Sequence, residues 1–536
     1  MQRNYPLQFG RPFLDGAITG EPQVLINGAP VASQADVKNR YPDGSVEFAV
    51  IAVVIPTLPA SGSLTLTFQN GPVGSHTPLT TAQMLDMSYN FNAQIMLKPA
   101  AGTSKTASGR TMLQNGNYQL WTAGPVAQTI MLADDGATRK YDLGFDGYRP
   151  FRPRFYATFW PATHQVAVRY VGENDNTQEI EDLSYGLTLI VGNMKGYGRA
   201  GLTHYAFSNW TERFWLGGTP AAQVNIDFNL AYLAATHFLP NYDPAAMPTA
   251  SALANEYALW TGKPHDLYDG IWDGGLWETV MSSPGERQEV GPYPTYSVMW
   301  AYSGDWRMRQ MALGMADLAA AFPGNLREGA AGKRLLRSDP AGSSTGLGRA
   351  VSLTDRRTLV AHQWTYAYTA PGDAVKIVGP VSTSGFWTFD DAHQPQPFFI
   401  PYLLTGDPWY LDEMYLWAGF TAGFTNGAAT GYPYGRGPTG AEGGEADELR
   451  AAGWLLRSRA EAAFIAPDSD PEKAYFTTLT NDALARWEGG LGLTGTALDG
   501  SAEKVWGAAM GNNYSGNNGP VSYKPPVLHG WESNGY

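Results

Sequence analysis

Two polar segments that lead into proline carry the residue types best suited to acid–base chemistry. The first runs from Glu286 to Pro294 and the second from Asp390 to Pro395; together they hold carboxylates, an imidazole, a guanidinium and several amides. Each precedes a short apolar and aromatic run that ends in a Gly-Asp pair, at Gly304-Asp305 and Gly406-Asp407. This pattern predicts two helix–turn–helix units built on one plan. Repeated units of this kind predict a solenoid or a closed helical ring, in which such segments gather at one mouth.

These side chains match the requirements of β-elimination from a uronic acid. One group must neutralise the carboxylate so that the C5 proton becomes acidic, a base must remove that proton, and an acid must protonate the leaving oxygen. Each role has candidates, namely Arg287 and Gln288 for the carboxylate, His393 as the base with Gln394 beside it as a donor, and Tyr293 or Tyr402 as the acid.

Two further candidates lie between these segments, and structural roles compete with all of them. His362 supplies a second imidazole and Trp364 a flat face for a sugar ring, so we expect both to contact substrate. The alternative is architectural. His393, which precedes a Gln-Pro pair, can cap a helix or tie two hairpins together, and Arg287 can pair with Glu289.

Hydrolysis is the second chemistry that these segments allow. A glycoside hydrolase needs two carboxyl groups, about 5 Å apart for retention or about 6.5–9.5 Å apart for inversion. Glu289 and Asp391, with Asp390 as a substitute, occupy equivalent positions before the two helical units. Sequence does not measure their separation. Carboxylates at such positions also serve as helix N-caps, which is the structural alternative.

Cofactor motifs are weak in this chain. Donor types for a metal are present in both segments, but no tight ligand spacing occurs and the chain has no cysteine. We therefore expect no cofactor, with a Ca²⁺ ion in the acidic run Glu442–Glu448 as the alternative. The run Gly342–Gly346 matches the Gly-x-Ser-x-Gly pattern, but no apolar strand leads into it, so a loop is expected rather than a nucleophile elbow.

Composition favours a carbohydrate partner. Charged residues make up only 16% of the 536 residues, whereas tryptophan (17) and tyrosine (29) are abundant, and their rings stack on the C–H faces of sugars or fill a core. The net charge is −13 and no run of lysine or arginine occurs, which argues against nucleic-acid binding. An acidic sugar can still bind through a local arginine cluster.

The N-terminal residues predict no secretion signal. The stretch Met1–Pro6 lacks the apolar core of a signal peptide, and the longest apolar run, Phe48–Ile55, is too short to span a bilayer. We expect no membrane insertion and a protein that is cytoplasmic as synthesised. Release by lysis or association with a virion are the alternatives for its final location.

The periodicity predicts a multidomain α+β protein with three regions. Residues 1–225 alternate short apolar runs with turn pairs such as Asn27-Gly28 and Asp43-Gly44, which predicts an antiparallel β sandwich or barrel. Residues 226–490 change to a helical period, consistent with an (α/α) toroid of helical hairpins. Residues 491–536 are rich in glycine and asparagine and are expected to form an extension that lies on the surface or on a partner.

Four stretches resemble a known set of proteins. Phe9–Phe13 and Arg40–Val46 resemble the opening RIFT-type β-barrel of proteins similar to exo-rhamnogalacturonan lyases. Glu289–Pro292 and Asp391–Pro395, each followed by a Gly-Asp helix turn, resemble their helical toroid. The resemblance implies a β domain joined to an (α/α) toroid, an arrangement used by polysaccharide lyases and some glycoside hydrolases. Architecture alone does not define the reaction.

The first hypothesis is therefore a polysaccharide depolymerase that cleaves an acidic polysaccharide by β-elimination, with hydrolysis by Glu289 and Asp391 as the second chemistry. A different class of function is a non-catalytic, glycan-binding virion protein, such as a spike, fibre or decoration protein, that grips a cell-surface glycan. That class would bring a homo-oligomer or a virion partner. A cytoplasmic enzyme acting on oligosaccharides differs from the first hypothesis only in location.

Overall fold

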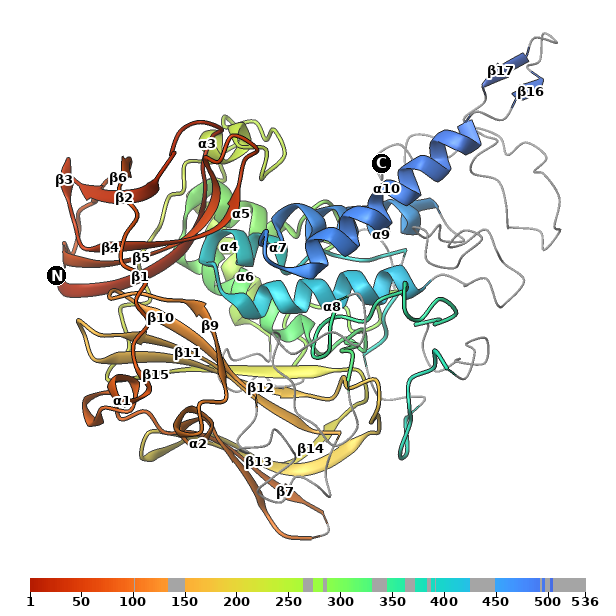
Figure 1. Cartoon of the computed structure of the whole chain (residues 1–536), viewed down its shortest axis with the longest axis horizontal. Coiled ribbons are helices and arrows are strands. Elements are labelled where there is room, and N and C mark those ends of the chain that lie inside the picture. The colour runs from red at the N-terminus through yellow and green to blue at the C-terminus, as the bar shows by residue number, and fades with distance from the viewer. Residues whose placement is uncertain are drawn as a thin grey trace.

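The computed structural model describes residues 1–100, 102–133, 150–263, 273–282, 287–329, 345–361, 372–382, 387–390, 392–424, 449–491, 494–496 and 502–504. The chain is mixed α/β, with antiparallel sheets in its N-terminal part and its longer helices in its C-terminal part (Figure 1). This confirms the predicted class and the predicted order of sheets and helices.

The first two sheets are small and antiparallel. One has the strand order β1-β5-β4 and the other β3-β2-β6. Every residue from Phe48 to Val53 in β5 is buried. Most of them pack in one cluster with helical side chains, whereas Ala52 packs with Val126, Ala127 and Trp160. The strands are β1 (Gln2–Pro12), β2 (Glu21–Ile26), β3 (Ala29–Pro30), β4 (Ser33–Arg40), β5 (Val46–Leu58) and β6 (Leu66–Gly71).

A glycine in β1 allows a helix to approach this sheet closely. A Cβ atom at Gly10 would overlap the carbonyl oxygen of Leu403 in α7 (Phe399–Thr405). Phe48 of β5 contacts the same helix at Tyr402, with ring centroids 5.6 Å apart, and stacks on Phe238 at 5.8 Å. The Phe-Gly-Arg stretch therefore serves as a docking surface for the helical part of the chain.

Two larger antiparallel sheets enclose a core of their own. One has the order β15-β12-β11-β10-β9 and the other β14-β13-β7-β8, and apolar side chains of both sheets form a single buried cluster. Short helical segments α1 (Thr81–Met84), η1 (Met87–Tyr89) and α2 (Gly109–Gln114) accompany them. The strands are β7 (Ala93–Pro99), β8 (Lys105–Ser108), β9 (Tyr118–Thr122), β10 (Gln128–Leu132), β11 (Arg152–Trp160), β12 (Gln165–Glu173), β13 (Leu183–Val191), β14 (Met194–His204) and β15 (Asn209–Leu216).

Helices dominate the chain after β15, and the two Gly-Asp turns among them are built alike. Gly304 and Gly406 both adopt left-handed backbone, with φ of 61° and 66°, a conformation that glycine accepts without strain. The aspartate that follows each glycine accepts a hydrogen bond from a backbone N–H two residues later, at 2.8 Å and 3.0 Å. The helices are α3 (Leu230–Ala235), α4 (Ala250–Thr261), α5 (Thr295–Ser303), α6 (Trp306–Ala319), α7, α8 (Pro408–Phe424), α9 (Leu449–Ile465) and α10 (Pro471–Leu491), and the short strands β16 (Thr494–Thr496) and β17 (Ala502–Lys504) follow them.

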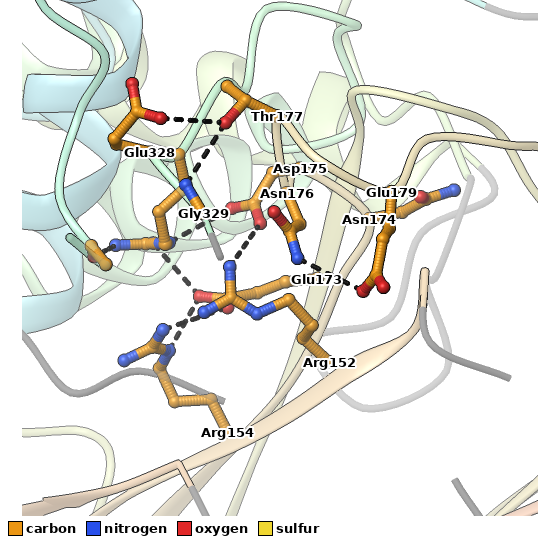
Figure 2. A network of polar contacts seen from close by, with 12 residues as sticks. Arg152, Arg154, Glu173, Asn174, Asp175, Asn176, Thr177, Glu179, Glu328 and Gly329 are labelled. Atoms are coloured by element: carbon orange, nitrogen blue, oxygen red, sulfur yellow. Dashed lines mark hydrogen bonds and ion pairs between the residues drawn. The ribbon is translucent and has the colours of Figure 1, made fainter. Parts of the chain in front are cut away.

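A buried network of charges joins the end of β12 to the helical part. Glu173 accepts hydrogen bonds from Arg154, at 2.7 Å, and from Arg327, at 3.0 Å (Figure 2). Arg327 also binds Asp175 at 3.2 Å, and Arg152 lies 3.5 Å from the other oxygen of Asp175. Burial alone would raise the pKa of Glu173, but Arg154 and Arg327 outweigh it and lower that pKa. These side chains are almost fully buried, so the network fixes the relative position of the segments that supply them.

We expect Arg327→Met to lower the free energy of unfolding by about 3–5 kcal/mol, because it leaves Glu173 and Asp175 buried with a missing partner. The matched control is Arg307→Met, since the Arg307 side chain is 25% exposed and pairs with Asp305 two residues earlier; an ion pair in contact with solvent contributes about 1 kcal/mol or less. Denaturant-induced unfolding measures both. Equal losses in the two variants would contradict a structural role for the network.

Candidate functional site

The structure brings the two proline-led segments together through Arg287. Its Nε lies 3.1 Å from Oε1 of Glu289, and its Nη2 donates to the backbone carbonyl of His393 at 3.4 Å. Its Nη1 donates to the carbonyl of Met281 at 3.0 Å. The side chains of Arg287 and Glu289 are only 9% and 3% exposed. The geometry therefore matches the architectural ion pair that the sequence left open as an alternative.

A second guanidinium, Arg457 of α9, also binds both segments. Its Nη1 donates to the carbonyl of Gly291 at 2.6 Å, and its Nη2 donates to the carbonyls of Gln394 and Pro395, each at 3.0 Å. The side-chain oxygen of Gln394, which is fully buried, accepts a hydrogen bond from Ser458 at 2.6 Å. Burial lowers the pKa of Arg457 to about 10. Arg457 and Arg287 thus act as two clamps across one junction.

Glu289 does not cap the helix that follows it. Helix α5 begins at Thr295, with Pro294 as its N-cap residue, and the carboxylate of Glu289 instead accepts from the backbone N–H of Glu278 at 3.4 Å. Burial raises the pKa of Glu289 despite the neighbouring guanidinium. Gln288 is half-buried, and its backbone carbonyl accepts a hydrogen bond from Thr295 at 2.8 Å.

Two further predicted residues, His393 and Tyr402, differ in their surroundings. The Nδ1 atom of His393 contacts Oδ2 of Asp390, and 14% of the His393 side chain is exposed. Tyr402 is fully buried against Phe48 and Trp121, on the side of α7 that meets the first sheet. The structure therefore does not bring Tyr402 to a solvent-accessible site.

A cavity of about 920 Å³ lies beside the junction. Its walls are the residues after α3, the start of α7 and the C-terminal half of α9, and they include Tyr293 of the first proline-led segment. Tyr293 stacks on Phe399 with ring centroids 5.3 Å apart. The aromatic lining residues are Phe238, Tyr242, Tyr293, Phe399 and Phe464. The described residues that line this cavity include neither His393 nor Glu289.

Glu461 lies in the wall of this cavity. Its Oε2 accepts a hydrogen bond from the amide of Gln396 at 2.6 Å, and the Tyr293 hydroxyl hydrogen-bonds to the same carboxyl group. Burial raises the pKa of Glu461 to about 7, against the opposing effect of Arg457. Burial and the adjacent Glu461 raise the pKa of Tyr293 far above its usual value. Near neutral pH the cavity therefore presents a carboxyl group that can gain or lose a proton beside a neutral phenol.

The sequence analysis did not single out Glu461, because a helical period alone does not show which charged residue of α9 faces a cavity. The available signal was the spacing of Arg457 and Glu461, which lie four residues apart and so share one face of the helix. His237 was also missed. It follows α3, adopts left-handed backbone with φ of 61°, and is the one imidazole among the described lining residues.

Three predicted site residues, Asp391, His362 and Trp364, lie outside the described residues, as does the acidic run Glu442–Glu448. Within the described ranges, no group of three or more histidine, aspartate or glutamate residues is arranged to hold a metal ion. In the same part of the chain, no helix has the length and apolar character needed to cross a membrane. Comparison with protein-family models and with curated proteins finds no match for this chain.

The raised pKa of Glu461 predicts a pH-dependent contribution to stability. The value rises from 4.5 to about 7 on folding, so the folded protein holds this proton more tightly than the unfolded chain. The resulting stabilisation is complete below pH 4.5 and is lost as the pH rises through 7. We therefore expect the stability of Glu461→Gln, relative to the natural protein, to increase over this range in denaturant titrations.

Asp305→Asn is the matched control for this measurement. Hydrogen bonds from Arg307 outweigh burial and lower the pKa of Asp305, so its stabilising contribution is present throughout the neutral range and is lost only in acid. The stability difference between Asp305→Asn and the natural protein should therefore stay constant over the pH range in which that of Glu461→Gln changes. A constant difference for Glu461→Gln as well would contradict the assignment.

Proposed function

We propose that this protein binds and cleaves an acidic polysaccharide in the cavity beside Tyr293 and Glu461, by β-elimination. The observation that supports this proposal is the Glu461 carboxyl group, which burial gives a pKa of about 7 and which is hydrogen-bonded to a phenol in an aromatic-walled cavity. A proton donor whose pKa lies near the working pH is what leaving-group protonation requires. Aromatic walls suit the C–H faces of sugar rings.

The proposed elimination uses Glu461 as the acid and His237 as the base. His237 removes the C5 proton of a uronate residue, the electron pair of the C5–H bond forms the C4–C5 double bond, and the C4–O bond breaks. Glu461 gives its proton to the departing oxygen, so the proton lost at C5 is balanced by the proton gained by the leaving group. Tyr293 holds Glu461 in position through their hydrogen bond. His237 takes the role first assigned to His393 because it lines the cavity.

The cavity favours elimination over hydrolysis. Glycoside hydrolysis requires two carboxyl groups that flank the scissile bond, about 5 Å or about 6.5–9.5 Å apart. Glu461 is the one carboxyl group among the described lining residues, which otherwise supply an imidazole, two phenols and an amide. Elimination needs an acid, a base and a group that binds the uronate carboxylate, and this set offers a carboxyl group, an imidazole and an amide for these roles.

The surrounding architecture is consistent with the toroid that the motifs imply. Helices α5 and α6 and helices α7 and α8 are hairpins joined by the same Gly-Asp turn, and α9 and α10 form a further adjacent pair (Figure 1). Repetition of helical hairpins supports an (α/α) toroid of the type found in proteins similar to exo-rhamnogalacturonan lyases, packed against the N-terminal β domain.

Glycan binding without cleavage is the second candidate function. The clamps formed by Arg287 and Arg457 hold the proline-led segments rigidly, and the cavity walls are largely aromatic. A rigid, aromatic cavity can serve recognition alone, as in a virion protein that grips a surface glycan. Measurements of turnover and of binding separate the two functions.

The test is incubation with polygalacturonate, alginate, hyaluronate and rhamnogalacturonan, followed by ultraviolet absorbance and by assay of new reducing ends. Elimination raises both signals, because it creates a conjugated double bond at the new non-reducing end. Glu461→Gln should reduce the rate by about 10²- to 10⁴-fold, the contribution typical of a positioned acid. Glu256→Gln is the control, since Glu256 is also half-buried with a pKa raised by burial, but lies outside the cavity.

The remaining outcomes identify the alternatives. New reducing ends without absorbance would show hydrolysis instead of elimination. Binding of a polysaccharide with neither signal would support the non-catalytic function. Turnover that survives in both Glu461→Gln and His237→Ala would remove the cavity from the mechanism.

A further inference from the structure

A second cavity, of about 370 Å³, lies where the larger sheets meet the helices. Its walls come from β1, β12 and β15, from the connection between β15 and α3, and from α5, α6 and the turn between α7 and α8. It shares no described lining residue with the cavity of Glu461. Junctions between packed layers are common positions for ligand sites.

Three guanidinium groups line this second cavity, and carboxylates balance two of them. Arg169 pairs with Asp317 at 2.8 Å and with Asp407 at 2.7 Å. Arg213 pairs with the other oxygen of Asp317 at 2.9 Å. The third, Arg309, donates to the carbonyl of Ala222 at 2.7 Å and hydrogen-bonds to the phenol of Tyr5, both of which are neutral.

Arg309 is therefore a cation whose hydrogen-bond partners among the described residues carry no charge. It is half-buried, and the adjacent Arg213 repels it. A guanidinium remains protonated in proteins, so its charge persists in the cavity. The protein as a whole is acidic, with a net charge of −13, which makes a local excess of positive charge informative. Such an excess in a cavity favours an anionic ligand.

The remaining lining residues suit a sugar ring. Trp215 and Trp306 line the cavity and are half-buried, so each side chain is partly accessible. Gln8 and Gln310 each accept a hydrogen bond through their side-chain oxygen, from Thr129 at 3.4 Å and from Tyr257 at 2.8 Å. Their amide nitrogens are then the donors that these two residues offer to hydroxyl groups.

We propose that this second cavity is a binding site for a uronate, with the sugar carboxylate on Arg309 and Arg213 and the ring against the tryptophans. The cavity volume is sufficient for one or two sugar rings. This site is separate from the cavity of Glu461, so the inference goes beyond the proposed cleavage and does not depend on it. Such a site would hold an acidic glycan at a distance from the position of cleavage.

Saturation-transfer difference NMR with the full-length protein tests this inference. The probes are galacturonate and glucuronate, with galactose and glucose as uncharged counterparts of the same ring shape, and inorganic phosphate as a competitor. We expect saturation transfer to both uronates, little transfer to the neutral sugars, and weak competition by phosphate. Equal transfer to neutral sugars, or displacement by phosphate at concentrations equal to the uronate, would overturn the assignment.

Variants locate the bound uronate. Arg309→Gln should weaken uronate binding by about 10- to 100-fold, the value of a charge-assisted hydrogen bond, and Arg309→Lys should restore part of it. Arg307→Gln is the matched control. Arg307 lies in the same helix as Arg309, but it pairs with Asp305 and lies outside the cavity. Equal effects of Arg307→Gln and Arg309→Gln would contradict the site.

Two further variants keep the result interpretable. If Arg309→Gln fails to fold, Gln310→Ala tests the same wall, and unchanged uronate affinity in that variant would overturn the proposal. Glu461→Gln should leave uronate binding at this site intact. Loss of all uronate binding in Glu461→Gln would place the uronate in the first cavity instead. Absence of turnover with binding at Arg309 preserved would count against the proposed function and leave this inference standing.

Discussion

Buried guanidinium groups are the constraint on which this structure depends. A guanidinium removed from water needs acceptors for its five N–H groups, so each one fixes the segments that supply them. Arg327 binds Glu173 and Asp175 at the end of β12, and Arg457 binds carbonyls of both proline-led segments. Apolar packing drives the association of sheets and helices without direction. These polar contacts determine how the packed segments align.

In both cavities, the partners that buried arginines bind determine the charge of a neighbouring side chain. Arg457 has its donors on backbone carbonyls, so burial dominates at Glu461 and raises its pKa to about 7. Asp317 and Asp407 form ion pairs with Arg169, and Asp317 also pairs with Arg213. The hydrogen-bond partners of Arg309 are therefore neutral groups. Arg457 is engaged by carbonyls, so Glu461 keeps a raised pKa, and the two aspartates are engaged by other arginines, so the charge of Arg309 is not balanced by a carboxylate of the described residues.

Local chemistry explains which features were predictable. The left-handed glycine and the capping aspartate of each turn are adjacent in the chain, so the sequence predicts the turn. The apolar run of β5 and the order of sheets before helices were visible for the same reason. The convergence of the two proline-led segments was also expected, and Arg287 and Arg457 now connect them. The direction of Tyr402 was not, because an aromatic residue in a short apolar helix has core on several sides.

The sequence by itself determined that antiparallel sheets precede helices and that two Gly-Asp turns interrupt the helical region, because periodicity and capping act over a few residues. It also determined that polar, proline-led segments precede two similar helical units. Only the tertiary structure decided that Glu461 lies beside Tyr293, 168 positions earlier, and that Arg309 has neutral partners. Burial and partner choice set the pKa and the charge balance of a side chain, and both arise from residues far apart in the chain.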